Sequence, residues 1–392
     1  MQKDWRGYMK KQEKGKVFYV CFYAEAEVEN KIIVYPSVIS KIDYIVDAVK
    51  SARKEVVLVS VAPSSKGKFS GYKKTIDSHE THIYLPSRTS KNKFLKKLYF
   101  IKQSIEIFLF LRKNVKENDT VLVYHSLHHL LWIKLYNRFA KGKLILQIED
   151  VFSSLTEKAK RQKKQEWKLF NRMQKCLCVN DILYEDLKNV PSKLVSYGNY
   201  NLPPQYKKQE DGKIRAVYAG VIEQERKAAF KAVQAAEYLP TNYEIHILGF
   251  GTQENISSLK EKIDEINQLM GRSAAFFQGK KTGEEYWRFL QNCDVALSTH
   301  TYSKDTLESA DYTFPSKVIT YMANNLPVVA QRLSVLEKSA IAENMVFYDH
   351  AEPREIASAI ITAFGKKHTS SRNTIQNLDH EFKKAIKSFL EE

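Results

Sequence analysis

The chain has 392 residues, of which 43% are hydrophobic and 12% aromatic. This length allows two ordinary domains with a core each, and the composition excludes an intrinsically disordered protein. The formal net charge of +17 predicts attraction to polyanions such as an anionic membrane, nucleic acid or anionic ligands. No recognised nucleic-acid-binding motif is present, so nucleic acid is not an expected partner.

The four cysteines are too few for a disulfide framework. Cys176 and Cys178 also have the wrong spacing for a usual zinc knuckle, so all four are expected to pack as small apolar residues in a reducing compartment.

Residues 1–16 are polar and lack the apolar stretch of a secretory signal. No run approaches the roughly 18 apolar residues that span a bilayer. The expected location is the cytoplasm, with a peripheral place on the inner face of the membrane suggested by the charge.

Apolar runs of strand length alternate with amphipathic runs of helix length, which predicts parallel α/β layers. In the first half, strands are expected over residues 17–23, 55–61, 82–85, 121–124, 144–148, 175–180 and 194–197. Helices are expected over residues 37–54, 91–114 and 127–140. Residues 63–80 are rich in Ser, Gly and Lys, and they are expected to form an exposed loop.

Two basic runs lie in this half, at residues 91–100 and 158–168. The first mixes lysines with apolar and aromatic residues. Two interpretations stay open: solvated helix faces, or a peripheral surface that docks on acidic lipid head groups.

Residues 199–212 contain Pro203-Pro204 and a polar run, which predicts an interdomain linker. The same alternation then restarts. Strands are expected over residues 214–219, 244–248, 274–277 and 294–298, and helices over 228–238, 257–270, 284–292 and 379–390. The predicted domains are therefore residues 1–205 and 206–370, with residues 371–392 forming a last helix that crosses back to the first domain.

Residues 312–330 are the most informative segment, and they predict a loop, a helix beginning at Pro315 and a short buried strand. Pro at the first helical position loses no hydrogen bond. The first-turn amides near Ser316 and Lys317 would then point at an anion, most often a phosphate. Ser316 adds a hydroxyl donor and Lys317 a positive charge. The helix is expected to end near Asn325, because Asn tolerates the left-handed cap conformation.

This segment resembles the donor-binding signature of GT-B glycosyltransferases, particularly retaining family-four-like enzymes with a Pro-Ser-Lys loop. The resemblance implies two Rossmann-like α/β domains facing a central cleft. It also implies that Pro315, Ser316 and Lys317 hold the diphosphate of a nucleotide sugar, a UDP-sugar rather than a GDP-sugar, without a metal or further cofactor. Thr320 stands where the family usually has a Glu that binds both ribose hydroxyls. Thr is not a bidentate anionic acceptor, so this departure weakens the expected ribose recognition.

Other residues of the second half fit the same resemblance. Gly220 ends the first strand of the second domain, and Arg226 and Lys227 follow it where the family supplies bases to the donor phosphates. A solvated helix start is the alternative for these two bases. Gly249 and Gly251 follow the next strand, in a loop that lies near the base and ribose in the family. A Gly-x-Gly turn is common after strands, so this signal alone is weak.

Candidate catalytic groups follow two strands of the first half. His125 is the first residue beyond the strand at 121–124, where open α/β sheets place ligands, and similar enzymes have a His here that reaches the donor sugar. Asp150 follows Glu149 at the end of the next strand, and it is expected to orient the acceptor hydroxyl or act as a general base. A purely structural His125 and a helix N-cap by Asp150 stay open as alternatives.

The resemblance therefore predicts a glycosyltransferase that moves a sugar from a nucleotide diphosphate donor to a hydroxyl of a glycan or lipid-linked glycan, as in bacterial-type surface polysaccharide assembly. The expected partners are this donor, this acceptor and an anionic membrane surface. Two alternatives stay open. One is a nucleotide-sugar epimerase of the same fold. The other is a glycosyltransferase-like partner subunit without activity, which Thr320 and Glu149 suggest.

Overall fold

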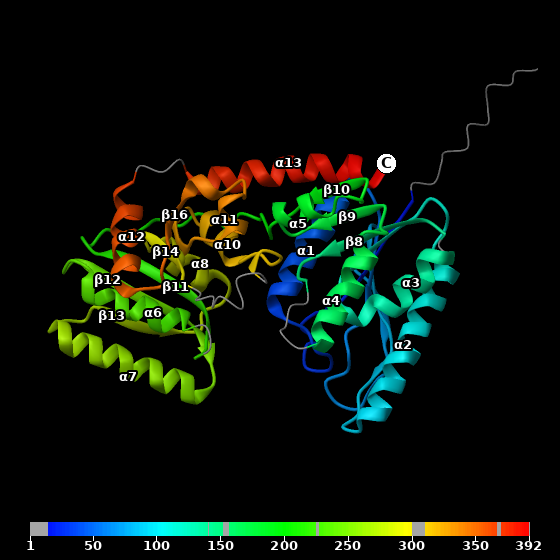
Figure 1. The fold of residues 1–392 in the computed structure, drawn as a ribbon, viewed down its shortest axis with the longest axis horizontal. Coiled ribbons are helices and arrows are strands. Elements are labelled where there is room, and N and C mark those ends of the chain that lie inside the picture. The colour runs from blue at the N-terminus through cyan, green and yellow to red at the C-terminus, as the bar shows by residue number, and fades with distance from the viewer. Residues whose placement is uncertain are drawn as a thin grey trace, which may run out of the picture.

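The computed structural model describes residues 15–139, 141–151, 157–224, 227–299, 310–366 and 370–391. They form two α/β domains that lie side by side, each built on its own sheet (Figure 1). The expected fold class of two Rossmann-like domains is confirmed. Within the described ranges, no helix combines the length and apolar character needed to cross a membrane.

The main sheet of the first domain contains β1 (Val17–Cys21), β2 (Val56–Ser60), β4 (Tyr72–Thr75), β5 (Glu80–Tyr84), β7 (Thr120–Tyr124), β8 (Lys143–Ile148), β9 (Lys175–Cys178) and β10 (Ser192–Val195). Their order is β10-β9-β8-β7-β1-β2-β5-β4, and every neighbouring pair is parallel except β4 with β5. The chain order reverses between β1 and β7, so ligands are expected outside the carboxyl ends of that pair.

The central strands were readable from the sequence because both of their faces are covered. Every residue of β1 is buried, and such strands appear as continuous apolar runs. The helices of this domain are α1 (Pro36–Ser51), α2 (Lys93–Asn114), the 3-10 helix η1 (Leu127–His129), α3 (Leu130–Phe139), α4 (Glu157–Phe170) and α5 (Asp181–Asp186).

The expectation of an exposed loop over residues 63–80 is wrong in part. β3 (Lys68–Phe69) pairs antiparallel with β6 (Ser87–Arg88), and β4 extends the edge of the main sheet. In β4, half-buried residues alternate with exposed ones. Edge strands are often short and lysine-bearing, so β4 lacks the apolar run that marked the central strands.

The second domain contains β11 (Ile214–Ile222), β12 (Tyr243–Gly251), β13 (Ala275–Gly279), β14 (Val295–Ser298), β15 (Val328–Gln331) and β16 (Met345–Tyr348). Their order is β13-β12-β11-β14-β15-β16, entirely parallel, as in dinucleotide-binding folds. The order reverses between β11 and β14. The helices are α6 (Ala228–Ala235), η2 (Ala236–Tyr238), α7 (Gln253–Met270), α8 (Gly283–Gln291), α10 (Lys317–Ala323), α11 (Ser334–Glu337), η3 (Ala342–Asn344) and α12 (Pro353–Gly365).

The last helix, α13 (Ser371–Glu391), lies along both domains (Figure 1). Near its start, Arg372 Nη1 donates to the carbonyl of Ala323 at 2.8 Å, in the second domain. Farther along, the Tyr44 hydroxyl of the first domain donates to Asp379 Oδ1 at 2.9 Å. The helix begins at Ser371, before the expected residue 379, and Ile375 in its second turn is buried.

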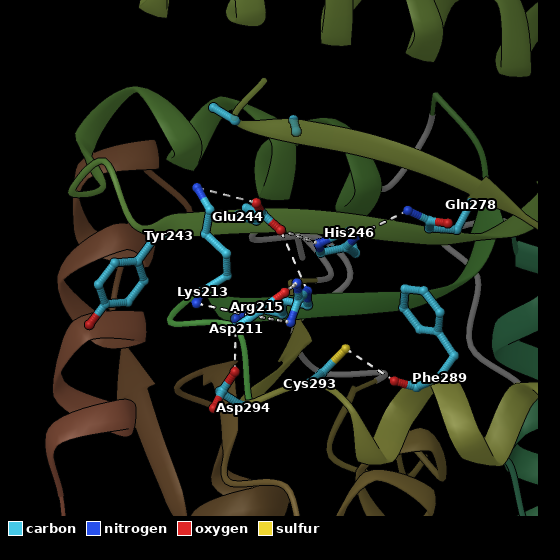
Figure 2. Close-up of polar contacts among 12 residues, drawn as sticks. Asp211, Lys213, Arg215, Tyr243, Glu244, His246, Gln278, Phe289, Cys293 and Asp294 are labelled. Atoms are coloured by element: carbon cyan, nitrogen blue, oxygen red, sulfur yellow. Dashed lines mark hydrogen bonds and ion pairs between the residues drawn. The ribbon is translucent and has the colours of Figure 1, made fainter. Parts of the chain in front are cut away.

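Figure 2 shows a polar cluster at the amino ends of β11 and β12. Glu244 lies 3.5 Å from Arg215 Nε, 3.6 Å from Lys213 Nζ and 3.2 Å from His246 Nε2. Arg215 also forms an ion pair with Asp211, at the end of the interdomain linker. Burial lowers the pKa of His246, against the opposing effect of Glu244. This cluster fixes the end of the linker to the sheet.

All four cysteines are buried and unpaired, as expected from the sequence.

Candidate functional site

The two domains contact each other through segments that follow the carboxyl ends of their strands. Asn180, which follows β9, donates through Nδ2 to the carbonyls of Asp311 and Thr313 at 3.2 Å each. Gly198, which follows β10, packs on α10 so closely that a Cβ there would lie 3.2 Å from Ile319 Cγ1. The Pro-Ser-Lys segment therefore lies where the carboxyl ends of the two sheets approach each other.

The structure corrects the expected start of the signature helix. α10 begins at Lys317 and has 7 residues, with Ser316 as its N-cap in helical geometry. Pro315 precedes the cap and accepts a hydrogen bond from Val318 N at 2.9 Å, which tightens the first turn. Ser316 is exposed, and its side chain forms no capping bond to the helix. At the other end, Asn325 adopts a φ of +64°, as predicted.

Tyr321 fixes α10 to the carboxyl end of β11. Its fully buried hydroxyl accepts a hydrogen bond from Ala219 N at 2.8 Å and donates to Ala219 O at 3.2 Å. Sequence reasoning missed this residue. Its place in the apolar run of the helix indicated a buried side chain, but it gave no sign of the partner of the hydroxyl.

Lys317 lies directly against Gly220. A Cβ built on Gly220 would lie 2.0 Å from Lys317 Nζ and 2.6 Å from the Tyr218 hydroxyl oxygen. The ammonium also lies 5.2 Å from the centre of the Tyr218 ring, within cation–π distance. A side chain at position 220 would displace the ammonium from this place. The fold thus brings two of the predicted residues together at the point where the strand order reverses.

Gly249 and Gly251 lie within the β11–β12 ladder, opposite Gly220 and Ile222. A Cβ on Gly249 would lie 1.9 Å from the Gly220 carbonyl oxygen, and one on Gly251 would lie 2.4 Å from the Ile222 carbonyl oxygen. Both glycines therefore allow the strands to continue pairing beyond their expected ends. Their predicted place near a base and ribose stays a prediction.

Of the two bases predicted after Gly220, the structure describes Lys227. Arg226 lies outside the described residues. Lys227 is the N-cap of α6 with a φ of +49°. It lines a hollow of about 400 Å³ together with Lys231 of α6 and Glu261 of α7. Its predicted contact with donor phosphates stays a prediction.

Thr320 is half-buried, one turn after Ser316 on the same side of α10, and its backbone N–H donates to the Ser316 carbonyl at 3.4 Å. α10 contains no acidic residue. The helix therefore offers no carboxylate where the resembling family binds ribose.

His125 is buried at the carboxyl end of β7, and its Nε2 lies 2.7 Å from Glu166 Oε1 on α4. Glu166 is itself 1% exposed. Sequence reasoning missed this partner because it lies in the basic run. The Glu166 carboxylate accepts a hydrogen bond from the Nε2–H of His125. Nδ1 has no hydrogen-bond partner among the described residues.

The neighbouring His129 has a structural environment. Its Nδ1 donates to the Tyr124 carbonyl at 2.9 Å, and its ring stacks on Phe22 at 4.9 Å between centroids. Burial, reinforced by the nearby His125, lowers the pKa of His129 to about 3. The ring is therefore neutral at ordinary pH.

Two carboxylates follow β8 and differ in environment. Glu149 Oε1 accepts a hydrogen bond from Gln147 Nε2 at 2.6 Å and lies 3.5 Å from Lys41 Nζ. Burial lowers the pKa of Lys41, against the opposing effect of Glu149. Asp150 is exposed, and residues 152–156 before α4 lie outside the described residues, so its predicted role and the alternative of a helix N-cap both stay predictions. The two neighbouring carboxylates therefore differ in exposure, Glu149 being half-buried and Asp150 exposed.

The basic helix α4 also contacts Tyr312, which precedes Pro315 in the segment 312–330. Tyr312 lies edge-on to Trp167 at 5.3 Å between centroids, and Lys163 Nζ lies 5.6 Å from the Tyr312 ring centre. The Tyr312 hydroxyl donates to Asp186 Oδ2 at 2.9 Å. Part of this basic run therefore forms an interdomain contact rather than a solvated face.

Among the residues that the structure describes, no group of three or more His, Cys, Asp or Glu side chains is arranged to hold a metal ion.

Residues 202–388 match the family model for Glycosyl transferases group 1. The matched residues include Gly220 and Lys317. No protein of curated function matches the sequence.

Solved structures resemble the chain over nearly its whole length. They include the α,α-trehalose 6-phosphate synthase of Burkholderia multivorans (TM-score 0.65, 10% identity, covering 96% of this chain and 96% of that chain). Another is the sucrose-phosphate synthase of Thermosynechococcus elongatus (TM-score 0.64, 12% identity, 96% and 98%). A third is HepE of Anabaena in complex with UDP and glucose (TM-score 0.60, 11% identity, 96% and 99%). Because the identities are so low, these likenesses establish the fold of the chain and nothing finer.

Proposed function

We propose that the protein is a retaining glycosyltransferase that moves a sugar from a UDP-sugar to a hydroxyl of a glycan or lipid-linked glycan, in surface polysaccharide or glycoconjugate assembly. The observation that carries this proposal is the contact between Lys317 and Gly220 at the carboxyl end of β11, within a domain that matches group 1 glycosyltransferases. The complex of HepE with UDP and glucose supports the choice of UDP.

In this proposal Lys317 and the Ser316 hydroxyl hold the diphosphate of the donor. When the glycosidic bond to the diphosphate breaks, negative charge develops on the leaving phosphate oxygen, and the Lys317 ammonium stabilises it. Arg226 and Lys227 are proposed as further phosphate contacts. The reaction then depends on positioning and on leaving-group stabilisation rather than on a resident metal.

In the first domain, Asp150 is proposed to orient the acceptor hydroxyl, because its carboxylate is exposed beyond β8. His125 is proposed to face the donor sugar, with Glu166 fixing the orientation of its ring. Asp150→Asn should lower the transfer rate while leaving the affinity for UDP unchanged, because the acceptor rather than the nucleotide loses a contact.

A second candidate function rests on Thr320. A helix without a carboxylate for ribose suits a glycosyltransferase-like subunit that binds a partner without turning over donor.

The test is a thermal-shift and calorimetric titration with UDP, GDP, ADP, CMP and dTDP. UDP should stabilise the wild type, and Lys317→Ala should lose most of that effect. Lys384→Ala removes an exposed lysine from α13 and serves as the matched control. If no nucleotide binds at millimolar concentration, the proposal fails and the second candidate takes its place.

A further inference from the structure

α2 exposes a continuous row of large apolar side chains. The row consists of Phe94, Leu98, Ile101, Ile105 and Leu109. Their spacing of three and four residues places them on one side of the helix. Phe94 is 74% exposed and Leu109 is 55% exposed. Single exposed apolar residues are common on proteins, but a row along a whole helix is not.

This row is separate from the side of α2 that packs on the domain. The buried residues of the helix are Ser104, Ile107 and Leu111, and their helical positions lie on another side. α2 is therefore apolar on two sides, and the described structure covers only one of them.

α3 continues the row. Leu131, Leu135 and Phe139 are exposed at one-turn intervals, and the Phe139 ring lies 6.4 Å from Phe108 of α2. Figure 1 shows the two helices together on the part of the first domain away from the second domain. We call these side chains the α2–α3 surface: Phe94, Leu98, Ile101, Ile105, Leu109, Leu131, Leu135 and Phe139.

The charges on these helices are almost all positive. α2 carries Lys93, Lys96, Lys97, Lys102, Arg112 and Lys113, and α3 carries Lys134 and Arg138, all of them exposed. The acidic residue on α2 is Glu106, which lies 3.8 Å from Lys102 Nζ, and α3 has none. An apolar row beside exposed cations complements a partner with an apolar interior and an anionic rim.

We infer that the α2–α3 surface docks on a bilayer that contains anionic lipids. The apolar side chains enter the boundary between head groups and acyl chains, and the flanking lysines contact the lipid phosphates. α2 lies in the plane of the interface and does not span it. A protein partner would present fixed acidic residues at fixed places, whereas the cations here are spread along the full length of α2 and α3. The inference uses no residue of the donor site, so it stands apart from the proposed sugar transfer.

Co-sedimentation with vesicles tests this inference, using phosphatidylcholine alone and mixed with phosphatidylglycerol. The full chain should bind the mixed vesicles and bind the neutral ones weakly. Leu98→Glu with Ile105→Glu should weaken binding at least about tenfold, because each change removes apolar contact and adds repulsion. Lys97→Glu with Lys102→Glu should also weaken binding, and the remaining affinity should depend less on salt.

The matched controls place the same changes in the second domain and on α13. Leu269→Glu with Ile361→Glu alters two exposed apolar residues elsewhere, and Lys384→Glu with Lys387→Glu changes the net charge equally. Both controls should bind vesicles within about twofold of the wild type. Circular dichroism verifies that each variant is folded.

Absence of binding to mixed vesicles by the wild type would overturn the inference. Equal binding by the Leu98 and Ile105 double variant and its control would do so as well. A dimer that dissociates in the double variant, without vesicle binding by the wild type, would instead assign the surface to a second copy of the chain. Failure of UDP binding leaves this test unaffected.

Discussion

Gly220→Ala should weaken UDP binding although it removes no functional group. The added methyl would lie 2.0 Å from Lys317 Nζ, well inside contact distance. The flexible ammonium must therefore move away from the carboxyl end of β11. The methyl also lies 2.6 Å from the Tyr218 hydroxyl oxygen, so the ring that supports the ammonium is displaced as well.

The magnitude follows from the interaction that is lost. An ammonium about 4 Å from a phosphate charge gains about 4 kcal/mol at an effective dielectric constant near 20. After desolvation, a hydrogen bond to a charged group contributes about 1.5–3 kcal/mol. Displacing Lys317 should therefore raise the Kd for UDP by about 10- to 150-fold.

A double-mutant cycle shows whether the effect passes through the lysine. UDP affinity is measured by calorimetry for the wild type, Gly220→Ala, Lys317→Met and the double variant. In the Lys317→Met background, Gly220→Ala should change the Kd by no more than about twofold, because the displaced group is already gone. An equal loss from Gly220→Ala in both backgrounds would refute the reasoning, as would an unchanged Kd in Lys317→Met.

Two further predictions concern stability. Tyr321→Phe should lower the free energy of unfolding by about 1–3 kcal/mol in urea denaturation, because the buried N–H of Ala219 loses its partner; a change near zero would mean that the helix anchor is unimportant. His82 lies 2.6 Å from Glu25 and 2.7 Å from Glu80. Burial lowers the pKa of His82, but the two carboxylates outweigh it and raise the pKa above the ordinary 6.5, while the pKa values of both carboxyls fall below 4.5. The stabilisation that charged His82 contributes is fully present below pH 6.5 and is lost as the pH rises through the raised pKa. The stabilisation that the two ionised carboxylates contribute is present above pH 4.5. The stability difference between wild type and His82→Gln should therefore be largest between about pH 4.5 and 6.5, and a difference that grows at higher pH would contradict this account.

The fold could be predicted where burial leaves a mark on the sequence. β1 and β11 are largely buried, so they appear as apolar runs, although their carboxyl ends differ from the expected ones by two and three residues. β4 could not be found in this way, because an edge strand presents polar residues to solvent. Gly249 and Gly251 were interpreted as a loop, because the sequence does not show that β11 approaches closely enough to require them in the strand.

The site could be predicted only as separate pieces. Ser316 and Lys317 carry a local pattern that the sequence displays. The contact between Lys317 and Gly220 depends on how α10 packs on β11, and no local pattern encodes it. Glu166 illustrates the same limit, because a run of lysines around it indicated an exposed helix, whereas this carboxylate turns inward to His125.

The chain passes between the two domains twice, once in the linker and once in α13. Arg372 joins both passages, because its guanidinium donates to the Pro203 carbonyl at 2.7 Å and to the Ala323 carbonyl at 2.8 Å. Farther along α13, Lys175 Nζ of the first domain donates to the Phe389 carbonyl at 2.7 Å. α13 is thus held to the second domain near its start and to the first domain near its end. A protease cut in the linker should therefore leave the two domains held together by α13.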